Sequence, residues 1–133
     1  MTSLSARTLT ITIDRPFDQA YAFAREPANF AKWAAGLART LHQEDGQWLA
    51  QTPEGQAIVH FSPPNEYGVL DHQVLLPGKP PISIPLRMIA NGDGTEVVFT
   101  LFRLPDITDP MFERDVASVK KDLQALRALL EQS

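Results

Sequence analysis

The C-terminal segment of this chain carries one stripe of large apolar side chains at helical spacing. Six residues, three or four positions apart, form the stripe: Phe112, Val116, Val119, Leu123, Leu126 and Leu130. Charged and amide residues such as Glu113 and Gln124 lie off it, which is typical of an amphipathic helix. Thr108-Asp109-Pro110 supplies a capping side chain and a proline suited to a first helical turn. The pattern predicts one long helix reaching nearly to Ser133, with a face that must be covered.

The rest of the chain consists mainly of short segments that favour strands. Residues 8–13 alternate threonine with leucine and isoleucine, and this period of two predicts a strand. Pro16 ends that strand, helical spacing follows to Arg25, and Pro27 begins a second short helix that is predicted to end at Gly36. Six further strands are predicted between turn signals, at residues 41–43, 48–50, 56–61, 69–75, 82–90 and 97–103. The predicted order is strand, two short helices, six strands and one long helix (β-α-α-β6-α).

Three hairpin turns decide which strand residues share a face, because a turn of known length sets the pairing register. The turns lie at Asp45-Gly46, Pro53-Glu54 and Gly92-Asp93. They pair Trp48 with Val59 and Leu86 with Phe99. One face then collects the apolar side chains: Leu41, Trp48, Ala50, Ala57, Val59, Phe61, Ile82, Ile84, Leu86, Met88, Val97, Phe99 and Leu101. The other face collects mainly polar ones: His42, Gln51, Gln56, His60, Arg87, Glu96 and Thr100.

A sheet with one apolar face needs a cover, and the C-terminal helix is the element large enough to supply it. We therefore predict a single α+β domain over residues 1–133, in which a curved antiparallel sheet wraps around the long C-terminal helix. A chain of 133 residues can bury such a core without outside cross-links. The space between the sheet and this helix is where a functional site is expected.

The strand at residues 69–75 has two registers, because the proline-rich turns on both sides of it can hide a bulge. In one register Val69, Asp71 and Gln73 face inward. In the other, Leu70, His72 and Val74 do, and we favour this set because it is more apolar. It would place His72 in the middle of the apolar face. Continued alternation past Leu101 would place Arg103 on the same face, at the end of the last strand.

Composition and charge exclude several classes of protein. The chain has no cysteine, which excludes disulfides, thiolate metal sites and cysteine nucleophiles. Its 12 basic and 16 acidic residues give a net charge of −4, and the basic residues are scattered, so no nucleic-acid partner is expected. The three histidines do not converge, so we expect no metal site and no cofactor. Without a signal peptide or an apolar run that spans a bilayer, we predict a cytoplasmic protein that does not insert into membranes.

Several segments resemble a known superfamily. Leu9 to Trp33, with Ile11-Thr12-Ile13-Asp14-Arg15-Pro16 before Asn29-Phe30-Ala31-Lys32-Trp33, resembles the opening of the helix-grip (SRPBCC) superfamily. That superfamily includes START lipid-transfer domains, birch-pollen-allergen-like proteins and polyketide cyclase/dehydrase-like proteins. Tyr67 to His72 and Asn91 to Phe102 resemble bacterial members that mostly have no assigned function.

This resemblance covers almost the whole chain and is specific for the fold, since the superfamily has no common catalytic motif. It implies a cavity between the sheet and the C-terminal helix that holds an apolar or aromatic molecule. The competing cone-shaped fold of the ketosteroid-isomerase type would normally place its long helices before the sheet. Here the long helix comes last, which argues against that fold.

The leading functional hypothesis is the binding of a small hydrophobic or aromatic ligand, such as a lipid or a polyketide-like metabolite. The residues expected to line its cavity combine large apolar side chains with two polar ones: Trp33, Trp48, Val59, Phe61, His72, Leu86, Met88, Phe99, Arg103, Phe112 and Val116. The alternative is a cyclase or dehydratase-like enzyme, with His72 as general acid/base and Arg103 holding a substrate oxygen. A third hypothesis is a protein-interaction module or homodimer that uses Val98 and Phe102.

Overall fold

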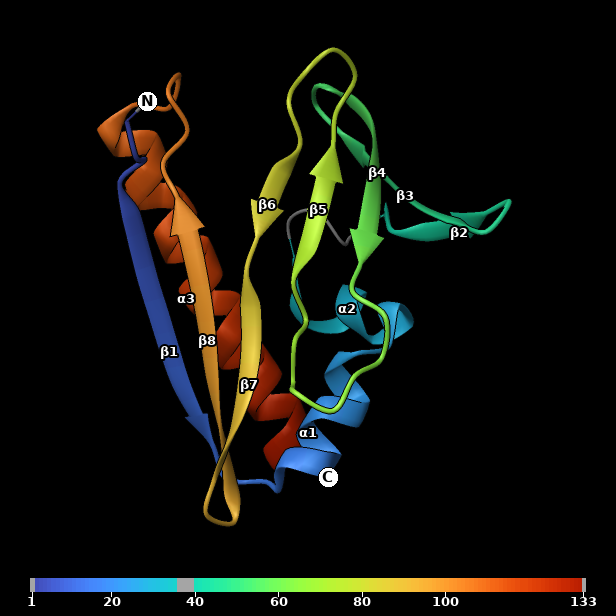
Figure 1. Ribbon diagram of the computed structural model, residues 1–133, viewed down its shortest axis with the longest axis vertical. Helices are drawn as coiled ribbons and strands as arrows, with labels where there is room; N and C mark the ends of the chain where they lie inside the picture. Colours follow the sequence, from blue (N-terminus) through green and yellow to red (C-terminus); the bar gives the residue numbers. More distant parts are fainter. Residues whose placement is uncertain (1, 36–39, 133) are drawn as a thin grey trace.

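The chain runs from a long strand through two short helices into a series of hairpins, and it ends in one long helix (Figure 1). The computed structural model describes residues 2–35 and 40–132. Its elements follow in this order: β1 (Ala6–Ile13), α1 (Phe17–Ala24), α2 (Pro27–Trp33), β2 (His42–Glu44), β3 (Gln47–Thr52), β4 (Gly55–Phe61), β5 (His72–Leu75), β6 (Ile82–Ile84), β7 (Leu86–Asn91), β8 (Gly94–Phe102) and α3 (Asp109–Glu131). The predicted α+β architecture is confirmed. The predicted helix end at Gly36 lies outside the described residues.

Pro85 divides the strand that the sequence predicts over residues 82–90. A proline has no N–H for the ladder, so pairing is interrupted there and the strand becomes β6 and β7. As a result the curved antiparallel sheet has two parts, a three-stranded part in the order β1-β8-β7 and a five-stranded part in the order β2-β3-β4-β5-β6. The carbonyl oxygen of Pro85 still accepts a hydrogen bond of 3.1 Å from the N–H of Thr100.

The hairpin registers agree with those derived from the turns. Trp48 pairs with Val59 and Ala50 with Ala57, while Leu86 pairs with Phe99 and Met88 with Val97. The exception lies beyond Pro85, where Ile84 was expected opposite Leu101. Because the sheet divides at Pro85, Ile84 belongs to the five-stranded part and pairs with His72 of β5.

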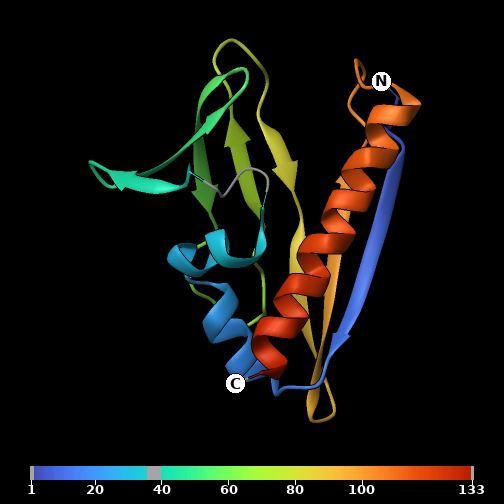
Figure 2. The ribbon, with the colours of Figure 1, turned by 180° about the vertical axis from the view of Figure 1, so that it is seen from behind.

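The long helix α3 lies along the three-stranded part of the sheet (Figure 2). The side chain of Thr108 caps its first turn by accepting a hydrogen bond from the N–H of Met111, as the Thr-Asp-Pro sequence predicts. Five residues of the predicted stripe are buried: Phe112, Val116, Leu123, Leu126 and Leu130. They share one core with Ile13, Met88 and Val97 of the sheet.

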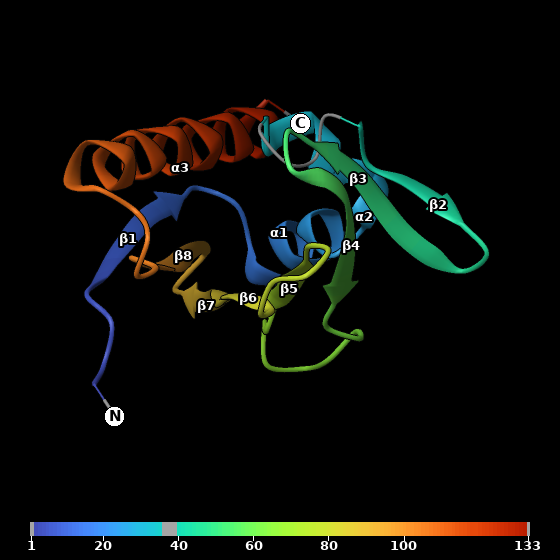
Figure 3. The ribbon, with the colours of Figure 1, turned by 90° about the horizontal axis from the view of Figure 1, so that it is seen from above.

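The second part of the sheet has a different neighbour. Figure 3 shows α1 and α2 beside the strands β4 and β5, while α3 extends away over β1. α2 contacts α3, and its Phe30 packs against Phe61 and His72 of the five-stranded part. The prediction that α3 alone covers the apolar face is therefore incomplete. The junction of α2, α3 and the divided sheet is the place where a site can form.

The outer face of the sheet carries few large apolar side chains. Ile89 and Phe102 are exposed there, and Val98 is half-buried. The homodimer contact through Val98 and Phe102 stays a prediction. Among the described residues, every helix is too short or too polar to cross a membrane.

Candidate functional site

His72 of β5 faces the interior, as the favoured register predicts. Leu70 and Val74 point the same way, since Leu70 packs against the core and Val74 is buried. Asp71 points outward instead. Its carboxylate accepts hydrogen bonds of 2.9 Å from the guanidinium of Arg87 and from the backbone N–H of Leu86. This pairing fixes the register, because turning the strand over would bury that carboxylate and break both contacts.

Two facts define the state of the His72 imidazole. The ring is 5% exposed, and its Nδ1 lies 3.2 Å from the carbonyl oxygen of Leu70. A carbonyl can only accept, so Nδ1 carries the hydrogen and, in the neutral ring, Nε2 presents a lone pair. Burial lowers the pKa of His72 below its ordinary 6.5, and the Leu70 hydrogen bond and the charge of Asp71 only partly offset this. At neutral pH the ring is therefore an uncharged acceptor.

Aromatic rings surround this imidazole, with Phe30 of α2 at their centre. The Phe30 ring stands edge-on to Trp33 at 5.0 Å, to His72 at 5.3 Å and to Phe61 at 5.6 Å between centroids. Trp48 adds a further edge-on contact to Phe61 at 6.3 Å. Such arrangements fix the rings in defined orientations beyond what apolar burial alone would do.

An apolar cavity of about 390 Å³ opens beside these rings, between α2, α3 and the strands β5, β6 and β8. Its lining combines aromatic and aliphatic side chains with a few polar ones: Phe30, Trp33, Ala34, Ala35, His72, Ile84, Phe99, Ser118, Lys121 and Asp122. A second space of about 20 Å³ lies on the other side of Trp33 and His72, against Phe61, Leu70 and Leu86. His72 and Trp33 thus form part of the wall of both spaces.

The polar side of the cavity is formed by α3. The carboxylate of Asp122 accepts a hydrogen bond of 3.2 Å from the N–H of Ala35. Partial burial raises the pKa of Asp122, and the hydrogen bond from Ala35 works against that rise. Ser118 and Lys121 stand beside it and are exposed. The cavity therefore has an aromatic interior and a polar edge, which is the usual composition of a site for a small organic molecule.

Trp33 contributes an unusual feature to the cavity wall. The side chain is 3% exposed, yet its indole Nε1–H has no hydrogen-bond partner in the structure. Buried tryptophan nitrogens normally find an acceptor, because an unpaired buried donor costs roughly 1–3 kcal/mol.

The structure distributes the expected cavity residues over three places. Trp33, His72 and Phe99 line the 390 Å³ cavity, and Phe61 and Leu86 line the smaller space. Trp48 and Val59 pair with each other beside this site. Met88, Phe112 and Val116 lie in the core between α3 and the three-stranded part of the sheet.

Arg103 lies elsewhere and has other partners. Its guanidinium donates a 2.9 Å hydrogen bond to the carbonyl oxygen of Ile107 and pairs with the carboxylate of Asp109. Arg103 therefore anchors the loop that leads into α3, and it does not line the cavity with His72. The expectation that Arg103 contacts a ligand is wrong in this structure, because alternation along a strand says nothing about what occupies the space beyond its end.

Sequence reasoning missed four residues that matter in the cavity: Phe30, Ser118, Lys121 and Asp122. Phe30 had a usable signal, since it precedes Trp33 by three residues and so shares its helix face. Lys121 and Asp122 had none, because their positions off the apolar stripe are typical of a solvated helix face.

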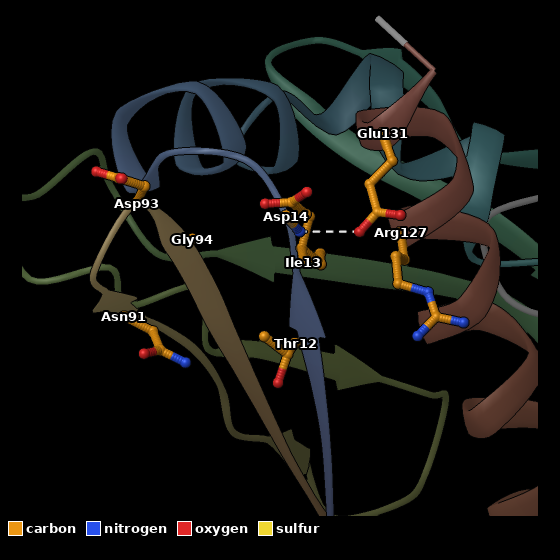
Figure 4. A pocket seen from close by; sticks show the side chains of 8 residues that line it. All are labelled: Thr12, Ile13, Asp14, Asn91, Asp93, Gly94, Arg127 and Glu131. Atoms are coloured by element: carbon orange, nitrogen blue, oxygen red, sulfur yellow. Dashed lines mark hydrogen bonds between the residues drawn. The ribbon is translucent and has the colours of Figure 1, made fainter.

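A larger hollow of about 580 Å³ lies at the far end of β1 (Figure 4). Its lining is mostly polar: Thr12, Ile13, Asp14, Asn91, Asp93, Gly94, Arg127 and Glu131. Within it, the backbone N–H of Asp14 donates a 2.8 Å hydrogen bond to Glu131, which ties the end of α3 to the sheet. It is an open surface depression without aromatic side chains. Among the described residues, no group of three or more His, Cys, Asp or Glu side chains is placed to hold a metal ion.

The lowered pKa of His72 predicts a specific pH dependence of stability. Above pH 6.5 the ring is neutral in both the folded and the unfolded chain, so it adds no slope. As the pH falls below 6.5 the unfolded chain takes up the proton first, and the free energy of unfolding decreases until the folded ring also protonates. Urea titrations from neutral to acidic pH should show this decline, with a contribution of at most about 1.4 kcal/mol per pH unit.

The variant His72→Phe should lose that part of the decline, since its ring cannot take up a proton. The control is His60→Ala, on the exposed face of β4. It should leave the contribution of His72 in place. Identical pH profiles for the wild type and His72→Phe would contradict the assignment of a buried neutral imidazole.

Comparison with solved structures places this architecture among known ones. XoxI from Bacillus cereus superposes with a TM-score of 0.74 at 12% identity, over 96% of each chain. CalU16 from Micromonospora echinospora superposes with a TM-score of 0.66 at 18% identity, over 94% of this chain and 73% of CalU16. Ara h 8.0201 superposes with a TM-score of 0.64 at 11% identity, over 98% of this chain and all (100%) of the other. No protein-family model matches the chain, and no curated protein is significantly similar to it in sequence. At these identities the likeness establishes the fold alone.

Proposed function

We propose, from the premise that this chain has the helix-grip fold, that it binds a small aromatic or otherwise apolar molecule in the cavity between α2, α3 and the divided sheet. The observation that carries this proposal is the cavity of about 390 Å³, which aromatic rings line on one side and polar groups on the other. Protein sites for small organic molecules range from about 300 to 1,000 Å³. This cavity is near the lower end, so it suits a molecule of one or two rings better than a long acyl chain.

The same site gives less support to catalysis. A general acid/base is usually oriented by a second group and works beside a group that holds the reacting oxygen. The neighbouring carboxylate of Asp71 points away to Arg87, and Arg103 is engaged with Ile107 and Asp109. His72 thus has only the carbonyl oxygen of Leu70 as its hydrogen-bond partner among the described residues. A binding role therefore fits this geometry better than the cyclase or dehydratase alternative.

A neutral naphthalene dye, N-phenyl-1-naphthylamine, tests the binding function. We expect one saturable site of micromolar affinity, with increased dye emission and quenching of tryptophan fluorescence. Because Trp33 lines the cavity and Trp48 lies beside it, Trp33→Phe should remove most of the quenching and Trp48→Phe should remove less.

A matched pair of filling variants locates the site. Ala35 lines the cavity, so Ala35→Phe should weaken dye binding at least about tenfold by occupying the space. Ala28 is exposed on the same helix, and Ala28→Phe should bind the dye as the wild type does. Unsaturable dye uptake, or equal binding by both variants, would refute a ligand site in this cavity.

A further inference from the structure

Two hydrogen-bonding atoms in the cavity wall lack a protein partner. One is Nε2 of His72, for which the described residues supply no hydrogen bond, since Nδ1 makes the contact to Leu70. The other is Nε1 of Trp33, a buried donor that has no acceptor. Both side chains contact Phe30, at 5.3 and 5.0 Å between ring centroids, so one aromatic ring lies between an acceptor and a donor.

The surroundings of these two atoms are otherwise apolar. Phe30, Ile84 and Phe99 form the walls on that side of the cavity, and the polar residues of α3 lie at its other side. A hydrophobic wall alone does not require a histidine and an unpaired indole N–H. Their presence indicates a ligand that carries a polar group at its buried end, because a buried donor and acceptor are costly unless a partner pairs with them.

We propose that His72 and Trp33 form a hydroxyl-binding subsite, in which an aromatic alcohol donates its O–H to Nε2 of His72 and accepts the N–H of Trp33 with its oxygen. This rests on the proposed binding function and narrows it to one class of ligand. A hydroxyl is the smallest group that both donates and accepts, so it satisfies the two wall atoms at once. A ring attached to it would lie among the aromatic side chains of the cavity.

The charges around the cavity favour a neutral hydroxyl over a carboxylate at this subsite. Burial lowers the pKa of His72, so at neutral pH its Nε2 offers a lone pair and no proton to an anion. Asp122 adds a half-buried carboxyl to the wall, which would repel a second one. Lys121, at the exposed edge, is the single cation among the lining residues and lies on the side of α3, away from β5.

Three small molecules of the same ring size test the subsite by calorimetric titration near neutral pH: 2-naphthol, 2-methylnaphthalene and 2-naphthoate. We expect 2-naphthol to bind about tenfold or more tightly than 2-methylnaphthalene, because the methyl group leaves both wall atoms unpaired. 2-Naphthoate should bind more weakly than 2-naphthol. In His72→Asn the shorter amide can still donate to Leu70 but has no acceptor at the Nε2 position, so the preference for 2-naphthol should fall severalfold.

Nuclear magnetic resonance of the unaltered chain gives a readout that does not depend on a variant folding. The sequence has two tryptophans, so the indole N–H signal of Trp33 can be assigned with the Trp48→Phe variant. On saturation with 2-naphthol, this signal should move downfield as the N–H acquires an acceptor, and the Nε2 resonance of His72 should move as it accepts a hydrogen bond. 2-Methylnaphthalene should not produce these shifts.

The outcomes separate the subsite from the wider proposal. Equal affinities for 2-naphthol and 2-methylnaphthalene, with no selective shift at Trp33 and His72, would overturn the hydroxyl subsite while the cavity remained a binding site. Tightest binding by 2-naphthoate would overturn it in favour of an anion site. Absence of binding by all three compounds would overturn both the subsite and the proposed function.

Discussion

A chain that ends before Asp109, and therefore lacks α3, should not unfold cooperatively. The helix buries five large apolar side chains against the three-stranded part of the sheet and against α2. Burial of each contributes about 1.5–3 kcal/mol, and their sum is comparable with the whole stability of a small domain, about 5–15 kcal/mol. Without the helix, the inward faces of β1, β7 and β8 would be exposed to water.

Circular dichroism during heating and one-dimensional proton spectra measure this effect. The truncated chain should show a broad, gradual loss of signal and poorly dispersed resonances. A chain shortened only after Glu131 is the control, because it keeps the buried stripe and the contact of Glu131 with the N–H of Asp14. A sharp melting transition in the chain without α3 would show that the sheet and the two short helices form a stable core without it.

The substitution Gly68→Ala should destabilise the fold by more than about 3 kcal/mol, because two costs combine. Gly68 has a φ of +73°, a left-handed conformation that costs residues with a side chain about 1–2 kcal/mol. In addition, an added Cβ would overlap the carbonyl oxygen of Met88 and lie 2.9 Å from the ring of Phe17. Backbone cannot move aside there, since the carbonyl of Gly68 also accepts a 2.9 Å hydrogen bond from the N–H of Met88.

Gly92→Ala isolates the second of these costs. Gly92 also has a left-handed φ, +59°, but a Cβ there meets nothing within 4 Å. This control should therefore lose only about 1–2 kcal/mol. Urea denaturation of both variants measures the difference, and equal losses would contradict a steric role for Gly68. Because Gly68 holds the chain against β7 just before Leu70, its substitution should also disturb the seat of His72 and weaken dye binding.

Much of the sheet was predictable because its determinants act between near neighbours. Asp45 and Gly46 both adopt positive φ, at 51° and 79°, as a two-residue hairpin turn requires, and the register of β2 and β3 follows from them. The orientation of β5 was predictable from the same logic. Of its two registers, the one that kept Asp71 and Gln73 out of the core is the one observed.

The candidate site was predictable only in part, and the difference between Phe99 and Arg103 shows why. Both follow from alternation along β8, and alternation correctly gives the direction of each side chain. Phe99 meets the cavity because α2 and α3 leave space beside it, whereas the guanidinium of Arg103 meets Ile107 and Asp109 of the next segment. Direction comes from the strand, but the neighbour comes from the packing.

Residue order was therefore sufficient for the kind and sequence of elements, for the hairpin registers and for the inward position of His72, since each depends on backbone geometry over a few residues. Three-dimensional packing was needed for the division of the sheet at Pro85, for the placement of α2 against β4 and β5, and for the cavity itself. The cavity walls join residues from five elements, among them Trp33, His72 and Asp122. Their approach depends on the angles at which helices and sheet meet, and these angles are set by the simultaneous burial of many side chains that lie far apart in the chain.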